Sequence, residues 1–193
     1  VISLIYFLGL MYLLFFMPRK QGIHSAAAFS PIPVTVIVAF RNEAAHLGNL
    51  CKAFESQTYP KEYLNIIFVN DHSEDRSANI LADYVRTYDK WQVLGLAPQK
   101  EGKKAALREG ILHSDTEYLL FTDADCRLEP GWVEAHVRSF QTEGADMCLG
   151  PVLIEDTKKW ALLEQLEFAA LGAVTAASAG AGNPVLSNGA NLS

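Results

Sequence analysis

The chain is poor in cysteine and in positive charge, and each shortage argues against a class of protein. Its three cysteines, Cys51, Cys126 and Cys148, are odd in number and widely spaced, so they predict neither a disulfide framework nor a zinc site. The 16 Lys and Arg residues stand against 22 Asp and Glu residues, which gives a formal net charge of −6. Nucleic-acid-binding proteins carry a basic surface, so no nucleic-acid partner is expected. Internal repeats and low-complexity tracts are also absent from the 193 residues, a length that fits one domain plus an appendage.

The chain opens with an apolar segment, VISLIYFLGLMYLLFFM, that has no charged residue over 1–17. As a helix it would span about 25 Å, slightly less than the roughly 30 Å of a bilayer's hydrocarbon core. Because the chain begins at Val, we expect the start of this segment to be missing and the whole segment to be a transmembrane helix. Pro18, Arg19 and Lys20 follow it, and basic flanks predict that the rest of the chain is cytoplasmic. A cleaved signal peptide with a site near 25–29 is the alternative.

A linker over 18–32 leads into alternating strand-like and helix-like segments that fill 33–193. Val34, Val36 and Val38 belong to a β-branched run, typical of a strand covered on both faces. Apolar runs predict further strands, and apolar spacings of three and four residues predict helices between them; the expected strands are 64–69, 93–96, 118–121 and 147–153. This order predicts an α/β fold with a Rossmann-like, mainly parallel sheet flanked by helices. A last helix over 160–182, rich in Ala and Gly, is expected to be buried or to lie on a membrane surface.

Two acidic motifs each follow an apolar run. Asp123 and Asp125 lie in FTDADC, and Asp71 and Asp75 lie in NDHSED. Carboxylates at the ends of parallel strands face the cleft in which open α/β sheets bind ligands. We expect the two strands to be adjacent, so that these side chains form a site for a nucleotide and a hard cation, Mg²⁺ or Mn²⁺. The alternative is two Asp-rich turns, because Asp favours turns by bonding its own backbone.

Five motifs, in order, resemble those of the family 2 glycosyltransferases, which are membrane-associated enzymes that use nucleotide-diphosphate sugars. They are VIVAFRNE at 36–43, VNDHSED at 69–75, GKKAALREGI at 102–111, FTDADC at 121–126 and SNGANLS at 187–193. The resemblance implies the nucleotide-diphospho-sugar transferase fold. It also implies metal-dependent transfer of a sugar, from a UDP-sugar by preference, to a hydroxyl of an acceptor glycan or lipid with inversion. The enzyme would work at a membrane, with its catalytic domain on the cytoplasmic side.

The resemblance further implies which residues bind the nucleoside. Phe40 would lie beside the nucleobase and Glu43 near the nucleoside. Asp71 would accept a hydrogen bond from the ring N–H of the base. Two plainer interpretations stay open: Glu43 as a carboxylate in the first turn of a helix, which the helix dipole favours, and Asp71 as a helix-cap residue, a role that Asp75 fills more naturally.

At the diphosphate, the resemblance assigns Lys103, whose charge would offset that of the phosphates. Lys100 and Lys104 belong to the same basic run, so the choice among the three lysines is open at this point. Arg108 stands where the family often has Asn. This departure affects the sugar or phosphate contacts expected from the helix that follows Lys103.

The remaining implied residues concern the metal and the acceptor. Asp123 would contact the ribose or the sugar and, with Asp125, the metal, which stabilises the leaving diphosphate. In SNGANLS, Asn188, Gly189 and Asn191 would lie on the acceptor or sugar side. Family 2 enzymes use an Asp that follows this loop as the base for the acceptor hydroxyl, so no catalytic base is expected within this chain.

Two other functions fit part of the sequence. LLFTDADC also resembles the DxD motif of haloacid-dehalogenase-type phosphatases, in which the first Asp is a nucleophile. That motif normally opens its domain, whereas three strand–helix units are expected before Asp123. The second alternative is a membrane-tethered module that binds a nucleotide without turnover.

Overall fold

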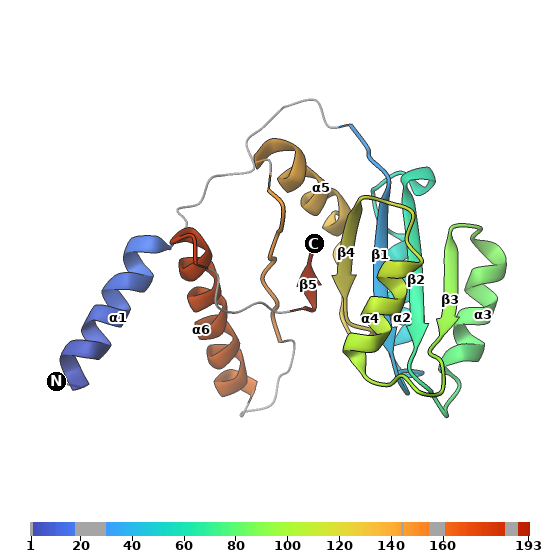
Figure 1. Ribbon diagram of the computed structural model, residues 1–193, viewed down its shortest axis with the longest axis horizontal. Coiled ribbons are helices and arrows are strands. Elements are labelled where there is room, and N and C mark those ends of the chain that lie inside the picture. Colours follow the sequence, from blue (N-terminus) through green and yellow to red (C-terminus); the bar gives the residue numbers. More distant parts are fainter. Residues whose placement is uncertain (1, 18–29, 144, 155–160, 184–188) are drawn as a thin grey trace. The chain divides into compact units, whose positions relative to one another are not determined.

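The structure is a computed structural model that describes residues 2–17, 30–143, 145–154, 161–183 and 189–193. These residues form two compact units. The smaller unit holds helices α1 (Ile2–Phe16) and α6 (Ala161–Gly180), and the larger unit holds a β-sheet with its flanking helices. Figure 1 labels both sets of elements.

The larger unit is built on a five-stranded sheet with the strand order β3-β2-β1-β4-β5. Strands β1 to β4 run parallel, and β5 pairs antiparallel with β4. The bounds are β1 (Val34–Phe40), β2 (Leu64–Asn70), β3 (Trp91–Gly95), β4 (Tyr118–Thr122) and β5 (Asn191–Leu192). The expectation of an α/β fold with a mainly parallel sheet is confirmed.

Strand β1 lies between β2 and β4, so the expectation that the two acidic motifs follow adjacent strands is wrong. The chain passes from β1 to β2 and β3 in one direction and then returns to place β4 on the other side of β1. Such a reversal is a topological switch point, and open α/β sheets bind ligands beyond the carboxyl ends of the strands there. The loop after β1 therefore stands between the two acidic loops.

Helices cover both faces of the sheet (Figure 1). The side chains of Val34, Val36 and Val38 belong to the larger core, together with α2 (Leu47–Glu55), α3 (Ser77–Thr87) and α5 (Trp132–Glu143). Ile67 and Val69 pack on the opposite face with α4 (Lys103–Leu112). Because side chains alternate along a strand, β1 and β2 contribute to both cores, as expected for strands buried on two faces.

Helix α4 approaches the sheet closely at Gly110. A Cβ atom on Gly110 would lie 2.5 Å from Cγ2 of Ile37 and 3.3 Å from Cγ2 of Val69. Only a residue without a side chain allows this approach. Since Gly102 and Lys103 stand at the start of α4, the close packing also determines where these two residues lie above the sheet.

The segment over 147–153 does not form the expected strand. Within it, Cys148 exchanges two backbone hydrogen bonds of 2.8 and 3.0 Å with Ser193, and Leu149 forms an isolated bridge rather than a continuous strand. Pro151 has no N–H to donate and therefore interrupts a ladder at this point. Strand β3 also begins two residues earlier than expected, at Trp91, whose ring stacks on Tyr88 and Tyr84 of the neighbouring segment.

In the smaller unit, α1 contacts α6. Helix α1 has 15 residues, which corresponds to about 22 Å. Among the described residues, no helix combines the length and the apolar character needed to cross a membrane, so the expected transmembrane helix over 1–17 is not found. Helix α6 confirms the last expected helix. Both helices expose apolar side chains, among them Leu4, Phe7, Leu8, Phe15, Leu162, Leu163 and Leu166.

Candidate functional site

A cleft of about 310 Å³ lies at the carboxyl end of the sheet, near the size at which small-molecule sites begin. Four segments line it: the end of β1, the loop after β2, the start of α4 and the loop after β4. The lining residues are Ala39, Phe40, Arg41, Glu43, Asp71, Lys103, Asp123, Ala124 and Asp125. All six residues expected at the nucleotide and the metal are therefore brought together. Arg41 was not expected, because it follows Phe40 without a pattern of its own.

Asp71 is the most buried carboxylate of this cleft, with a relative exposure of 6%. Its Oδ2 accepts the backbone N–H of Gly102 at 2.9 Å. Its Oδ1 is also buried, and the described residues offer it no hydrogen-bond partner. Because a buried carboxylate oxygen without a partner costs free energy, this oxygen is placed to accept a hydrogen bond from a ligand in the cleft.

Asp75 does not face the cleft, which corrects the expectation that the two Asp residues of NDHSED act together. Its Oδ1 accepts the N–H of Ser77 at 2.9 Å, at the start of α3, and its Oδ2 accepts the N–H of Ala44 at 3.0 Å. The hydrogen bonds, that with Ser77 first, lower the pKa of Asp75. Asp75 therefore supports a turn and ties the loop after β1 to the loop after β2.

Lys103 is the lysine of the basic run that lines the cleft. Its Nζ lies 2.5 Å from Oδ1 of Asp123, and the side chains are 51% and 31% exposed. Lys100 instead pairs with Glu109, at 2.7 Å. The structure thus distinguishes Lys103, which pairs with Asp123 in the cleft, from Lys100, which lies in the loop before α4 and binds Glu109 of that helix.

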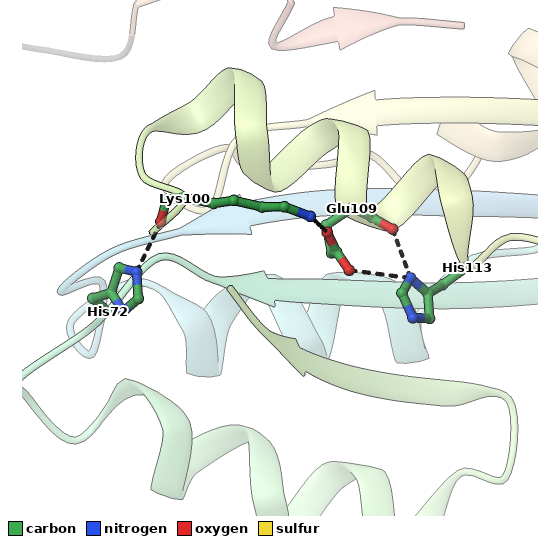
Figure 2. A network of polar contacts seen from close by, with 4 residues as sticks. All are labelled: His72, Lys100, Glu109 and His113. Atoms are coloured by element: carbon green, nitrogen blue, oxygen red, sulfur yellow. Dashed lines mark hydrogen bonds and ion pairs between the residues drawn. The ribbon is translucent and has the colours of Figure 1, made fainter. Parts of the chain in front are cut away.

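Figure 2 shows how the loop before α4 is held from both sides. Nε2 of His72 lies 2.9 Å from the carbonyl oxygen of Lys100, so Nε2 carries the proton and donates. The Lys100 ammonium binds Oε2 of Glu109, and Nδ1 of His113 donates to the Glu109 carbonyl at 2.9 Å. The hydrogen bond from Lys100 is the main cause of a lowered pKa at Glu109.

Several carboxylates lie close together in the cleft, and the pKa of Glu43 reflects this. Burial, followed by the charge of Asp125, raises the pKa of Glu43, and Asp123 adds a smaller contribution. Among the described residues, no three His, Cys, Asp or Glu side chains converge into a metal site. One or two carboxylates hold Mg²⁺ when phosphates and water complete its coordination. Asp123 and Asp125 fit a cation in that shared form.

Gly189 and Asn191, two of the residues expected on the acceptor or sugar side, are not part of the lining of this cleft. Oδ1 of Asn191 accepts hydrogen bonds from Nε1 of Trp132 at 2.9 Å and from Nε2 of His136 at 2.8 Å. Nδ1 of His136 lies 2.6 Å from Oγ of Ser193, and burial lowers the pKa of His136. These bonds fasten β5 to α5, so the side-chain oxygen of Asn191 has a structural role. Gly189 lies in the turn before β5.

Asn188, the remaining residue expected on the acceptor side, lies outside the described residues. Trp132 and His136 were not expected near this segment. The hydrogen bonds of Asn191 to Trp132 and His136 join positions that are 59 and 55 residues apart. A local sequence motif cannot predict a contact over such a separation.

The parallel sheet, its switch point and the acidic cleft define an α/β domain with a ligand cleft beyond the carboxyl ends of its strands. Residues 35–172 match Glycosyl transferase family 2, and the chain belongs to this family. It is 32% identical to the glycosyltransferase AglE of Haloferax volcanii over 119 residues, which cover 62% of this chain and 39% of that protein. It is 31% identical to a beta-monoglucosyldiacylglycerol synthase of Nostoc over 111 residues, which cover 57% of this chain and 24% of that protein.

Solved structures share the fold. The mannosyltransferase PcManGT from Pyrobaculum calidifontis, in complex with GDP-Man and Mn²⁺, has a TM-score of 0.67 at 19% identity and covers 95% of this chain and 50% of its own. TarS 1-349 of S. aureus, in complex with UDP, has a TM-score of 0.55 at 18% identity and covers 66% of this chain and 38% of its own. The chain thus spans half or less of these proteins.

Proposed function

We propose that this chain is the part of a glycosyltransferase that binds a nucleotide-diphosphate sugar, and that the nucleotide is UDP. The family and the acidic cleft at the switch point support the general activity. The observation that carries the choice of nucleotide is the buried carboxylate of Asp71, with one oxygen bound to Gly102 and the other open.

The open oxygen favours a base with a ring N–H. Uracil presents one such group, flanked by two carbonyls that accept, whereas cytosine and adenine present a ring nitrogen that accepts and would face the carboxylate unfavourably. Guanine offers an N–H and a neighbouring amino group, which pair best with both oxygens of a carboxylate. Since Gly102 already occupies Oδ2 of Asp71, a single ring N–H, as in uracil, is the better match. The two solved structures contain UDP and GDP-Man, so the fold alone does not decide between the bases.

The other end of the cleft suits the diphosphate and the sugar. Lys103 offers a positive charge, and Asp123 and Asp125 offer oxygens to a divalent cation, Mg²⁺ or Mn²⁺. Bound there, such a cation would stabilise the negative charge of the leaving UDP. Because Lys103 and Asp123 are paired at 2.5 Å, the diphosphate would take the Lys103 ammonium as its partner and free the Asp123 carboxylate for the cation.

The acceptor belongs to the same proposal. We propose transfer to a hydroxyl of a glycan or lipid with inversion; the family and the similarity to a beta-monoglucosyldiacylglycerol synthase support this proposal. We place the reaction at the cytoplasmic side of a membrane. The apolar side chains that α1 and α6 expose, such as Phe15 at 79% and Leu162 at 61%, support contact with a lipid surface.

Calorimetric titration of UDP, GDP and CDP in the presence of Mn²⁺ tests the proposal. We expect UDP to bind most tightly. Asp71→Asn should lower the affinity for UDP by about 10- to 100-fold, the range of a hydrogen bond to a charged group. Because the Asn amide can donate to the ring nitrogen of cytosine, the affinity for CDP should fall much less in this variant. Equal affinity for the three nucleotides, or an unchanged affinity for UDP in Asp71→Asn, would refute the assignment of the base.

Turnover needs its own test. The chain, or a longer form that contains it, is incubated with radiolabelled UDP-glucose, UDP-galactose or UDP-N-acetylglucosamine and vesicles that contain diacylglycerol. Labelled glycolipid supports transfer. Tight UDP binding without transfer to any lipid or glycan acceptor would favour the module that binds without turnover.

A further inference from the structure

The loop between β3 and α4 is held by two consecutive residues of the loop after β2. Asp71 accepts the N–H of Gly102 at 2.9 Å, and His72 donates to the carbonyl oxygen of Lys100 at 2.9 Å. The start of the same loop is fixed to the sheet, because the N–H of Leu96 binds the carbonyl of Asn70 at 3.0 Å. The backbone that leads to Lys103 is therefore fixed at both of its ends.

His72 adopts an unusual backbone conformation for this contact. Its φ is +54°, in the left-handed region, and the only other non-glycine residue with positive φ in the described part of the chain is Asn42. This region is uncommon for residues with a Cβ atom, and Asn and His enter it more often than most. The His72 side chain is exposed, so burial does not explain the strain. An outlier of this kind next to a ligand cleft points to a functional constraint.

The loop after β2, which carries His72, is itself held by hydrogen bonds to the loop after β1. The N–H of Asn42 binds Oγ of Ser73 at 3.0 Å, and Oδ1 of Asn42 accepts the N–H of Glu74 at 2.8 Å. These bonds tie the loops after β1 and β2 to each other. Because His72 belongs to a loop that is held in place, its hydrogen bond also holds the backbone of Lys100 in place.

The contact with Lys100 bears directly on Lys103. Lys103 follows Lys100 by three residues and is the first residue of α4, and Gly102, with φ +88°, makes the turn between them. The Lys100 side chain also binds Glu109 on α4 (Figure 2). A shift of the Lys100 backbone would thus move both the turn and the first residue of the helix.

We infer that His72 is a positioning residue: through the Lys100 carbonyl it sets Lys103 in place for the diphosphate of the bound nucleotide. This inference rests on the proposed function, because it assumes that the cleft takes a nucleoside diphosphate. His72 does not touch the nucleotide in this scheme. Its effect is expected chiefly at the phosphate end, with a smaller effect on the base through the Gly102–Asp71 hydrogen bond.

The first test compares UDP with uridine, which lacks the phosphates, in the presence of Mn²⁺. His72→Gly removes the imidazole and tolerates positive φ, and His72→Asn keeps a polar side chain that also tolerates it. We expect both variants to bind UDP about threefold to tenfold more weakly, the range of one hydrogen bond, and uridine within twofold of the wild type. His113→Ala is the matched control, because it removes an exposed imidazole from the same network without releasing the loop.

A second test needs no ligand. Hydrogen exchange at residues 100–105 should be faster in His72→Gly than in the wild type, and unchanged in His113→Ala. Equal losses for UDP and uridine, or unchanged exchange over 100–105, would overturn the inference. If the wild type binds no nucleotide, the proposed function fails, and the exchange result still decides whether His72 holds this loop.

Discussion

The close approach of α4 to the sheet predicts an unusual response to Gly110→Ala. In an exposed helix, Ala is more stable than Gly by about 1 kcal/mol. At position 110 the new methyl would lie 2.5 Å from Cγ2 of Ile37, whereas carbon atoms pack at about 3.5–4.0 Å. Ile37 is fully buried and β-branched, so its side chain has little freedom to move. Overpacking of this kind costs about 1–3 kcal/mol, which leaves a net loss of about 0–2 kcal/mol.

Gly48→Ala provides the control. Gly48 lies in α2, and a Cβ atom there would meet nothing within 4 Å. This substitution should stabilise the protein by up to about 1 kcal/mol. Because both changes are Gly to Ala in a helix, the difference between them isolates the cost of overpacking, about 1–3 kcal/mol.

Urea unfolding followed by tryptophan fluorescence measures this difference. Trp91 is 6% exposed and stacks on Tyr88 with ring centroids 4.6 Å apart, so its emission reports on the larger unit. The free energy of unfolding should be highest for Gly48→Ala, intermediate for the wild type and lowest for Gly110→Ala. A gap smaller than about 0.5 kcal/mol between the two variants, below the overpacking range, would show that α4 does not pack on Ile37 as described.

Three further predictions concern charge. Lys103→Met should weaken UDP by about 5- to 20-fold and leave uridine unchanged, since a partly exposed charged contact is reduced by solvent; equal loss of both in calorimetry would place Lys103 at the base. Removal of Mn²⁺ with EDTA should weaken UDP binding in the wild type but have little effect in Asp125→Ala, and an equal effect in both would remove Asp125 from the metal site. Burial lowers the pKa of His136 from 6.5, so the unfolded chain binds more protons below pH 6.5 and stability falls as the pH drops through this value. The melting temperature of the wild type should therefore fall more between pH 7.5 and 5.5 than that of His136→Gln, and parallel profiles would contradict this.

Apolar patterns in the sequence correctly predicted individual strands and helices. The run from Val34 to Val38 predicted a strand buried on both faces, and Lys103 was correctly expected at the start of a helix. The motifs also identified residues that share one cleft, including Asp71 and Asp123. Their roles toward the nucleotide and the metal stay predictions.

The order of the strands was beyond the sequence, because it depends on how distant segments pair. Periodicity cannot show that β1 separates β2 from β4, and the motif NDHSED alone cannot show that Asp75 bonds to Ala44. The anchoring of Asn191 by Trp132 and His136 is likewise a tertiary contact. The expected strand over 147–153 failed for a local reason that was visible in the sequence, since Pro151 cannot donate to a ladder.

In the proposed binding mode, the carboxylate of Asp71 joins the two ends of the cleft, because one oxygen would bind the base while the other holds Gly102. Binding at one end then alters the free energy of binding at the other, and such coupling is reciprocal. Uridine and pyrophosphate, added as separate molecules, should each raise the affinity of the protein for the other. An inhibitor that occupies only the base site would accordingly leave the loop better ordered for phosphate, so the two halves of the nucleotide cannot be optimised independently.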